Sequence, residues 1–304
     1  MKIKGLRRNY NIIKESAPYH LKLFVAPTIN NKHIAQNNGV EVNANNFDAL
    51  RRCIAVVYRD TTFISELVKD ELRYSLENIN VKINKGETVA IVGATGSGKT
   101  TLVNLITRFY DVTEGEVLVN GVNVKEYSQE DLRNKIAIAL QKSELFAGTI
   151  KENILWGKLD ATDEEVIEAA QIAQAEEFIL SKHDKYDEYI EEKGTSLSGG
   201  QKQRLSIARA IIKKPEILIF DDSTSALDLV TEAKLYKAMK EKINNVTRIV
   251  VAQRVATAKN ADKIIVLDGG TIIAYDTHEN LLNTCEVYQD IYNSQLKREG
   301  VFDE

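Results

Sequence analysis

Residues 93–100 read Gly-Ala-Thr-Gly-Ser-Gly-Lys-Thr, and this stretch decides the fold. It matches the phosphate-binding loop pattern G-x-x-x-x-G-K-[ST] at every constrained position. The apolar segment 88–92 before it predicts a buried strand, and the segment 101–106 after it predicts the start of a helix. In that setting, successive backbone N–H groups can surround phosphate oxygens at a helix N-terminus. The stretch therefore predicts a site for a nucleoside triphosphate.

Other residues of the predicted site come from the ends of apolar strands. Lys99 is expected to reach the β- and γ-phosphates, and the Thr100 hydroxyl is expected to ligate Mg²⁺. The apolar strand 217–220 leads into Asp221 and Asp222, where a carboxylate suits holding Mg²⁺ through water. Strands predicted at 136–141 and 248–252 deliver Gln141 and Gln253.

A second candidate anion site begins another helix. Residues 197–201 read Leu-Ser-Gly-Gly-Gln and precede a predicted helix at 202–212, so N–H groups and a hydroxyl meet at its start. An earlier helix is predicted at 162–181, where Thr162-Asp163-Glu164-Glu165 forms a capping-box pattern. The alternating segment 76–83 predicts a strand, and Asp268-Gly269-Gly270 predicts a hairpin turn.

The composition bounds the class of protein. The 304 residues carry a formal charge of −4, which does not indicate the basic surface that binds nucleic acid. Two distant cysteines offer no disulfide framework, so a reducing cytosol is expected. The N-terminus lacks the apolar run of a signal peptide, and no window of about 18 apolar residues exists to span a bilayer. Any membrane part is therefore expected on another chain.

The first quarter of the chain contains a partial repeat. Residues 1–37 show no clear periodicity, but residues 38–75 align with 120–157 at a constant offset, beginning with Asn-Gly-Val in both copies. The segment 56–63 also alternates like an antiparallel strand that could pair at the front edge of the nucleotide domain, and the two interpretations are compatible. Arg59 stands where the later copy has Gln141, so the repeat is not a second nucleotide site. It suggests duplication or gene fusion.

With these motifs in this order, residues 76–285 resemble the nucleotide-binding domain of an ABC transporter of the exporter type. The resemblance implies an α/β fold, with a P-loop NTPase (RecA-like) core, an antiparallel β subdomain and an inserted α-helical subdomain at about 142–212. Residues 286–304 are then a C-terminal helical tail, which we interpret as a solvated face. ATP and Mg²⁺ are the implied cofactors. The implied metal ligands are Thr100, Gln141 and Asp221, and the implied nucleotide contacts are Gly93, Ala94, Thr95, Gly96, Ser97, Gly98, Lys99, Thr100 and Thr101.

The resemblance also implies partners. In the family, two such domains enclose two ATP molecules head to tail, and closure moves the membrane domains. The signature residues, which act on the partner's ATP, are Leu197, Ser198, Gly199, Gly200 and Gln201. Asp228 belongs to the loop that crosses between subunits. We expect a second nucleotide-binding domain, transmembrane domains on other chains, no nucleic acid, and a location at the cytoplasmic face of the membrane.

The expected catalytic residues are Lys99, Gln141, Asp222 and Gln253, and two of them depart from the family pattern. Asp222 stands where the family usually has a glutamate general base, and Gln253 where it has a histidine. The shorter carboxylate falls about 1.5 Å short, and a misplacement of that size can cost about a hundredfold in rate. The pair resembles the degenerate half of a heterodimeric exporter, which binds ATP firmly and hydrolyses it slowly.

Two questions stay open at the level of sequence. The family stacks adenine on an aromatic residue before the phosphate loop, and Tyr74 is the nearest substitute, with Tyr58 further away. The alternative to an exporter subunit is an ATP-binding dimerisation or regulatory module, or a truncated remnant with little turnover. Soluble ABC ATPases of translation or DNA repair need a paired domain or long coiled coils, neither of which is present. The transported substrate is not encoded in such a domain.

Overall fold

The computed structural model describes residues 11–13, 23–25, 36–37, 40–41 and 76–298. The chain divides into two compact units between Ser75 and Leu76. The described parts of the first unit are two antiparallel strand pairs: β1 (Asn11–Ile13) with β2 (Leu23–Val25), and β3 (Gln36–Asn37) with β4 (Val40–Glu41). The strand expected at 56–63, together with Tyr58, Arg59 and Tyr74, lies outside the described residues.

The short pair β3–β4 has a counterpart in the second unit. There β6 (Leu118–Val119) pairs with β7 (Val122–Asn123), and Leu118 lies opposite Asn123. In the first unit Gln36 lies opposite Glu41, so both hairpins share one register at the offset of the sequence repeat. The rest of the repeat, residues 42–75, lies outside the described part of the chain.

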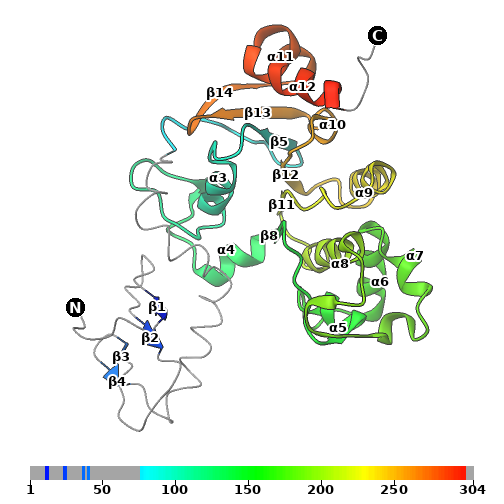
Figure 1. The fold of residues 1–304 in the computed structure, drawn as a ribbon. Helices are drawn as coiled ribbons and strands as arrows, with labels where there is room; N and C mark the ends of the chain where they lie inside the picture. Colours follow the sequence, from blue (N-terminus) through cyan, green and yellow to red (C-terminus); the bar gives the residue numbers. More distant parts are fainter. Residues whose placement is uncertain (1–10, 14–22, 26–35, 38–39, 42–75, 299–304) are drawn as a thin grey trace. The chain divides into compact units, whose positions relative to one another are not determined.

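The second unit is built on one six-stranded sheet in the order β14-β13-β5-β12-β11-β8 (Figure 1). Five strands are parallel, and only β14 at one edge is antiparallel to its neighbour β13. A central strand therefore has parallel neighbours on both sides, which places the carboxyl ends of the strands at one edge of the sheet. The bounds of the strands are β5 (Thr88–Val92), β8 (Ile136–Ala139), β11 (Ile217–Asp221), β12 (Thr247–Val251), β13 (Lys263–Asp268) and β14 (Thr271–Asp276).

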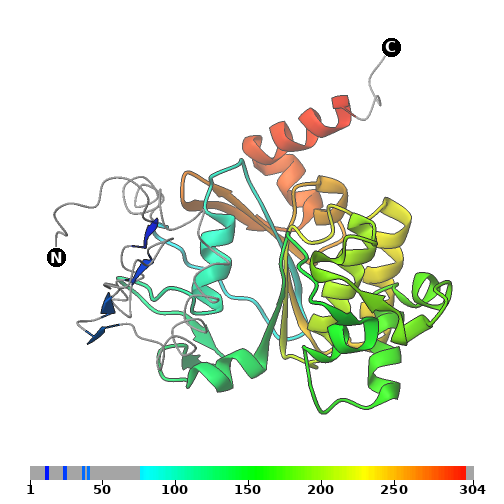
Figure 2. The same ribbon diagram turned by 60° about the horizontal axis from the view of Figure 1, so that its bottom comes forward.

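The continuous apolar strands are explained by burial on both faces of the sheet. Successive residues of β5 alternate between two hydrophobic cores, with Val89 and Ile91 in one and Ala90 and Val92 in the other. The first core is covered by α3 (Lys99–Ile106), α4 (Gln129–Lys135) and the β6–β7 hairpin. The second is covered by α8 (Gly199–Ile211), α9 (Leu229–Lys242) and the C-terminal helices, as Figure 2 shows from a second side.

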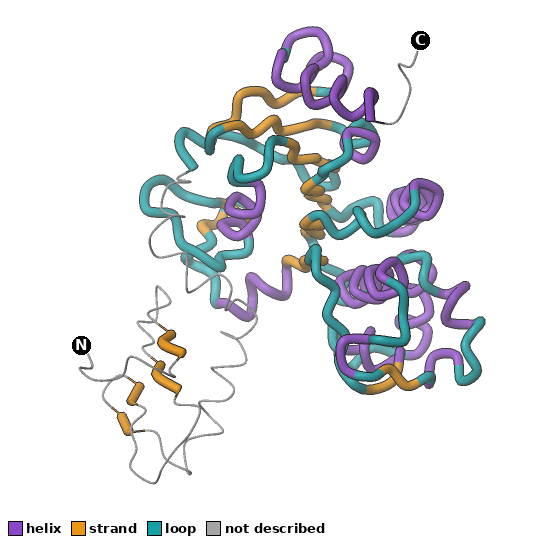
Figure 3. The backbone as a smooth tube through the Cα atoms, viewed as in Figure 1, coloured by secondary structure: helices purple, strands orange, loops and turns teal. Residues whose placement is uncertain are grey.

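An inserted helical region follows β8, visible as the purple cluster at the lower right of Figure 3. It contains α5 (Ile150–Leu155), α6 (Asp163–Ile172), α7 (Glu176–Leu180) and α8, with two 3₁₀ turns, η2 (Lys185–Asp187) and η3 (Glu192–Gly194), and the strand pair β9 (Gly148–Thr149) and β10 (Tyr189–Ile190). The capping box at Thr162 is confirmed. The single helix expected at 162–181 is wrong, because Gln174 adopts a left-handed φ of 58° and its carbonyl accepts a hydrogen bond from Arg204.

The strand expected at 76–83 does not form. Its alternation is real, because Ile79, Val81 and Ile83 are half-buried against a core while their neighbours are exposed. Two separate hydrogen bonds join the segment to β14 and the turn before β14, and they do not form a ladder. The Glu77 N–H donates to the Gly270 carbonyl, and the Tyr275 hydroxyl donates to the Lys82 carbonyl. No strand in the described part of the chain pairs with the segment, so the antiparallel subdomain consists there of the β6–β7 hairpin.

The described residues after β12 include the helices α10 (Val255–Ala258), α11 (His278–Thr284) and α12 (Glu286–Arg298). The interpretation of the tail as a solvated face is wrong for α12, because Tyr288 is completely buried in a hydrophobic core. Within residues 76–298 and the four short strands before them, no helix combines the length and apolarity needed to cross a membrane.

Candidate functional site

The phosphate loop joins the C-terminal end of β5 to the start of α3. Two of its glycines are required by geometry: Gly98 adopts a left-handed φ of 99°, and a Cβ on Gly93 would lie 2.1 Å from the Leu267 carbonyl oxygen. The Lys99 Nζ donates to the carbonyl oxygens of Gly93 at 2.9 Å and Ala94 at 2.8 Å. Burial lowers the pKa of Lys99, opposed by the neighbouring carboxylates of Asp221 and Asp222. The loop is therefore a tight backbone turn with the Lys99 ammonium bound to two of its carbonyl oxygens.

A hydroxyl and a carboxylate meet next to this loop. The Thr100 Oγ1 donates to Oδ1 of Asp221 at 3.4 Å, which brings the first turn of α3 to the end of β11. Asp221 is 8% exposed, and burial is the main reason why its pKa is raised. Oxygen atoms from hydroxyl and carboxylate groups are the ligands that Mg²⁺ prefers. The residues present thus fit a triphosphate in the loop and Mg²⁺ at Thr100 and Asp221.

Asp222 connects three loops at the carboxyl edge of the sheet. Its Oδ2 accepts hydrogen bonds from Nε2 of Gln141 and Nε2 of Gln253, both at 2.5 Å. The structure thus brings together three of the four expected catalytic residues. Burial raises the pKa of Asp222, and the hydrogen bond from Gln141 and the charge of Arg254 oppose the rise. The backbone of Asp222 is left-handed, with φ of 50°.

The expected signature residues lie at the start of α8, on the opposite face of the sheet from α3 (Figure 1). Ser198 caps α8: its Oγ accepts from the Gln201 N–H, and the Gln201 side chain accepts from the Ser198 N–H. Leu197 is buried, whereas an added Cβ on Gly199 would meet no atom within 4 Å. Asp228 caps α9 through the N–H and hydroxyl of Thr231. The structure therefore does not gather these residues around Lys99 in the same chain.

Several contacts of the site were missed at the level of sequence. Arg254 donates to the carbonyl oxygens of Ser225 and Leu227. Glu232, only 4% exposed, accepts from the Thr224 and Thr257 hydroxyls and so joins the loop after β11 to α10. The capping box at Ser198 was detectable, since Ser-x-x-Gln is its pattern. No local sequence pattern predicts the hydrogen bonds of Arg254 and Glu232, which join the loops that follow β11 and β12.

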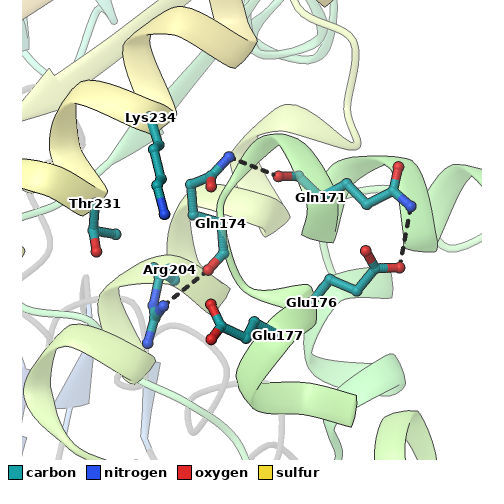
Figure 4. A pocket seen from close by; sticks show the side chains of 7 residues that line it. All are labelled: Gln171, Gln174, Glu176, Glu177, Arg204, Thr231 and Lys234. Carbon is teal, nitrogen blue, oxygen red and sulfur yellow. Dashed lines mark hydrogen bonds between the residues drawn. The ribbon is translucent and has the colours of Figure 1, made fainter.

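A separate polar pocket of about 180 Å³ lies between the helical insertion and α9 (Figure 4). Arg204 donates within it to the Gln174 carbonyl. None of the predicted site residues lines it; the lining residues are Gln171, Gln174, Glu176, Glu177, Arg204, Thr231 and Lys234.

Comparison with known proteins agrees with this geometry. A family model described as ABC transporter matches residues 76–225, the stretch that holds the phosphate loop, Asp221, Asp222 and the start of α8. This domain belongs to the ABC transporter family. Nucleotide-binding domains of ABC transporters are ATPases, so the activity of this ABC domain is ATP hydrolysis.

Relatives of the ABC domain carry the names of exporters. The putative multidrug export ATP-binding/permease protein YgaD of Bacillus subtilis (strain 168) is 46% identical over 240 residues, which cover 79% of this chain and 41% of the relative. A protein of the same description from Staphylococcus aureus (strain N315) is 46% identical over 236 residues, 78% of this chain and 41% of the relative. A solved bacterial Atm1-family ABC exporter with ATP bound superposes with a TM-score of 0.72 at 38% identity, over 75% of this chain and 40% of that chain. The chain therefore spans about two fifths of the length of these relatives.

Proposed function

We propose that this ABC domain binds ATP, hydrolyses it slowly, and couples closure with a second nucleotide-binding domain to substrate export through transmembrane domains on other chains. The names of the relatives, which join ATP binding to multidrug export, support the exporter class. The proposed location is the cytoplasmic face of the membrane, reached only through those partners. The degenerate-site half of a heterodimer is the form that the residues of the site support best.

Each residue of the site has a proposed task. Backbone N–H groups of 94–101 and the Lys99 ammonium bind the triphosphate, since a helix N-terminus and a cation both favour anions. Thr100, Asp221 and Gln141 hold Mg²⁺, which neutralises phosphate charge when it is bound. Asp222 is the general base that orients the attacking water.

The main support for slow turnover is the pair of hydrogen bonds that Asp222 accepts. One oxygen of this carboxylate accepts two amide donors at 2.5 Å, from Gln141 and Gln253. Hydrogen bonds to the charged form weaken it as a base, and the two amides fix the short side chain in place. A neutral amide at Gln253 also adds no positive charge beside the γ-phosphate. The arrangement suits a site that holds ATP more than one that consumes it.

The test is an ATPase assay on the variant with Asp222→Glu and Gln253→His together. We expect turnover to rise by about ten- to a hundredfold, because the longer carboxylate reaches the water and histidine contributes a charge. Lys99→Ala in the same background is the control and should abolish the gain. Unchanged turnover with undiminished ATP binding would refute the explanation by degeneracy and favour the alternative, an ATP-binding dimerisation or regulatory module.

The partners need a separate experiment. The signature residues at the start of α8 have open space in front of Gly199, which a second nucleotide-binding domain with its ATP can occupy. Co-expression with candidate exporter subunits in detergent, followed by affinity purification, should recover a transmembrane partner. Recovery of the chain alone, with and without ATP, would contradict the proposed role in export.

We also propose that the region before the ABC domain contains a degenerate copy of part of it. The shared register of β3–β4 and β6–β7 supports this origin, because the two hairpins pair equivalent residues of the repeat. Tyr74 remains the proposed adenine-stacking residue and lies outside the described residues. Replacing Tyr74 with alanine should weaken ATP binding by about tenfold, measured by titration with a fluorescent ATP analogue.

A further inference from the structure

The C-terminal helix α12 is fixed to the ABC domain by an apolar stripe. Tyr288 is completely buried, and its hydroxyl lies 2.7 Å from Nδ1 of His278 on α11. Ile291 and Tyr292, one turn later, are half-buried and pack against the same core. Positions 288, 291, 292 and 295 follow helical spacing, so Gln295 continues this stripe two turns beyond the buried tyrosine.

Gln295 uses both ends of its amide on one loop. Its Oε1 accepts from the Val255 N–H at 2.7 Å, and its Nε2 donates to the Gln253 carbonyl at 2.7 Å. These two backbone groups flank Arg254 in the turn between β12 and α10. The side chain of Gln253 is itself exposed, so packing does not fix it. The backbone around it therefore determines where its amide points.

The same loop is held from its other side by the segment after β11. The Arg254 guanidinium donates to the Ser225 carbonyl at 3.1 Å, and the Thr257 hydroxyl donates to buried Glu232 at 2.9 Å. Those contacts tie the loop to α9 and to the segment between β11 and α9. The contacts of Gln295 tie it to α12, on a different element. Loss of the second anchor leaves the loop able to pivot about the first.

We propose that Gln295 is a positioning residue for ATP hydrolysis: it holds the loop of Gln253 so that the Gln253 amide meets Asp222. The inference rests on the proposed role of Gln253 at the site. It gives the tail helix a task in the reaction, since α12 joins a core anchor at Tyr288 to the edge of the site. Gln295 acts through Gln253, because its two side-chain contacts are with the backbone on either side of Arg254.

The first arm of the test is amide hydrogen exchange in the full-length chain without nucleotide. Gln295→Ala should speed exchange of the Val255 amide by about tenfold, because its acceptor is removed. Gln295→Glu keeps an acceptor and should preserve protection of that amide. Gln289→Ala is the matched control: Gln289 lies on the same helix, but its amide donates to the Leu282 carbonyl, so exchange at Val255 should not change. Equal exchange in Gln295→Ala and wild type would overturn the proposal.

The second arm is steady-state ATP hydrolysis by the same variants. Gln295→Ala should raise kcat by about tenfold, because Asp222 loses the Gln253 donor that weakens it as a base. KM for ATP should stay within about twofold, because the phosphate loop is untouched. Gln289→Ala should match wild type. Faster exchange with unchanged kcat would overturn the positioning role and leave a purely structural contact. A wild-type chain without any turnover would refute the proposed slow hydrolysis, and Val255 exchange would then decide this inference alone.

Discussion

Asn153 offers the sharpest test of how the helical insertion is held to the ABC domain. It is 1% exposed on α5, and its side chain makes four hydrogen bonds. Its Oδ1 accepts from the Phe146 N–H and from Arg209, and its Nδ2 donates to the carbonyl oxygens of Phe146 and Thr149. One side chain thus joins the segment that follows Gln141 to the helix that begins with the signature.

Replacing Asn153 with alanine removes all four bonds. At about 1 kcal/mol of net stability for each bond, the loss is about 4 kcal/mol. Alanine is the better helix former by about 0.5 kcal/mol, which offsets part of it. We therefore expect the free energy of unfolding to fall by about 3.5 kcal/mol. With an m-value of about 3 kcal/mol/M, the urea midpoint should fall by about 1.2 M.

The chain supplies its own probe for this experiment. Trp156 is the only tryptophan, and its ring packs on Phe146 with 5.1 Å between the centroids. Its fluorescence therefore reports on the segment that Asn153 holds, and far-UV circular dichroism reports on the whole chain. Asn260→Ala is the control, because the Asn260 amide makes one exposed bond, and its effect should stay below about 0.5 kcal/mol. A loss below about 1 kcal/mol for Asn153→Ala would refute the reasoning.

Three further outcomes are expected. Burial raises the pKa of Asp221, so the ionised carboxylate destabilises the nucleotide-free fold above that raised pKa and has no such effect below the pKa of the unfolded chain. Asp221→Asn should therefore raise Tm at neutral pH but not in acid. Equal shifts of Tm at both pH values would contradict this. Hydrogen bonds from Lys214 and Lys158 lower the pKa of Glu165 to about 2, so its stabilisation is complete above its unfolded pKa and lost as the pH falls toward 2. Thermal melts of Glu165→Gln should therefore show a weaker acid dependence than wild type. Gly199→Ala should leave Tm unchanged, since its Cβ meets no atom within 4 Å, yet should weaken ATP-driven pairing in size-exclusion chromatography; normal pairing would argue against a signature that faces a partner.

Local sequence was sufficient for the parts of the site that lie on single strand-to-loop units. The phosphate loop and the delivery of Asp221 by β11 follow from a contiguous motif and an apolar run, and the structure has both. The contact of Gln141 with Gln253 through Asp222 has no such signal. Those residues come from three strands, and only the order of the sheet makes them neighbours.

Other differences arise from tertiary context. Alternation at 76–83 predicted which side chains are buried, but a strand also needs a partner, and no described strand supplies one. The helix breaks at Gln174, whose carbonyl accepts a hydrogen bond from Arg204. Local helix propensity cannot predict this hydrogen bond, because Arg204 lies on another helix. In α12, the polar pair Gln289 and Asp290 between Tyr288 and Ile291 obscured an apolar stripe that packs on the core.

The left-handed backbone at Asp222 has an evolutionary consequence. Aspartate and asparagine tolerate positive φ better than longer side chains, because their short polar groups can bond locally. A glutamate at this position would extend the reach of the carboxylate but add strain at φ of 50°. Selection for turnover and selection for a stable fold therefore pull this position in opposite directions. A lineage released from the need for fast hydrolysis would drift toward aspartate here and keep its fold.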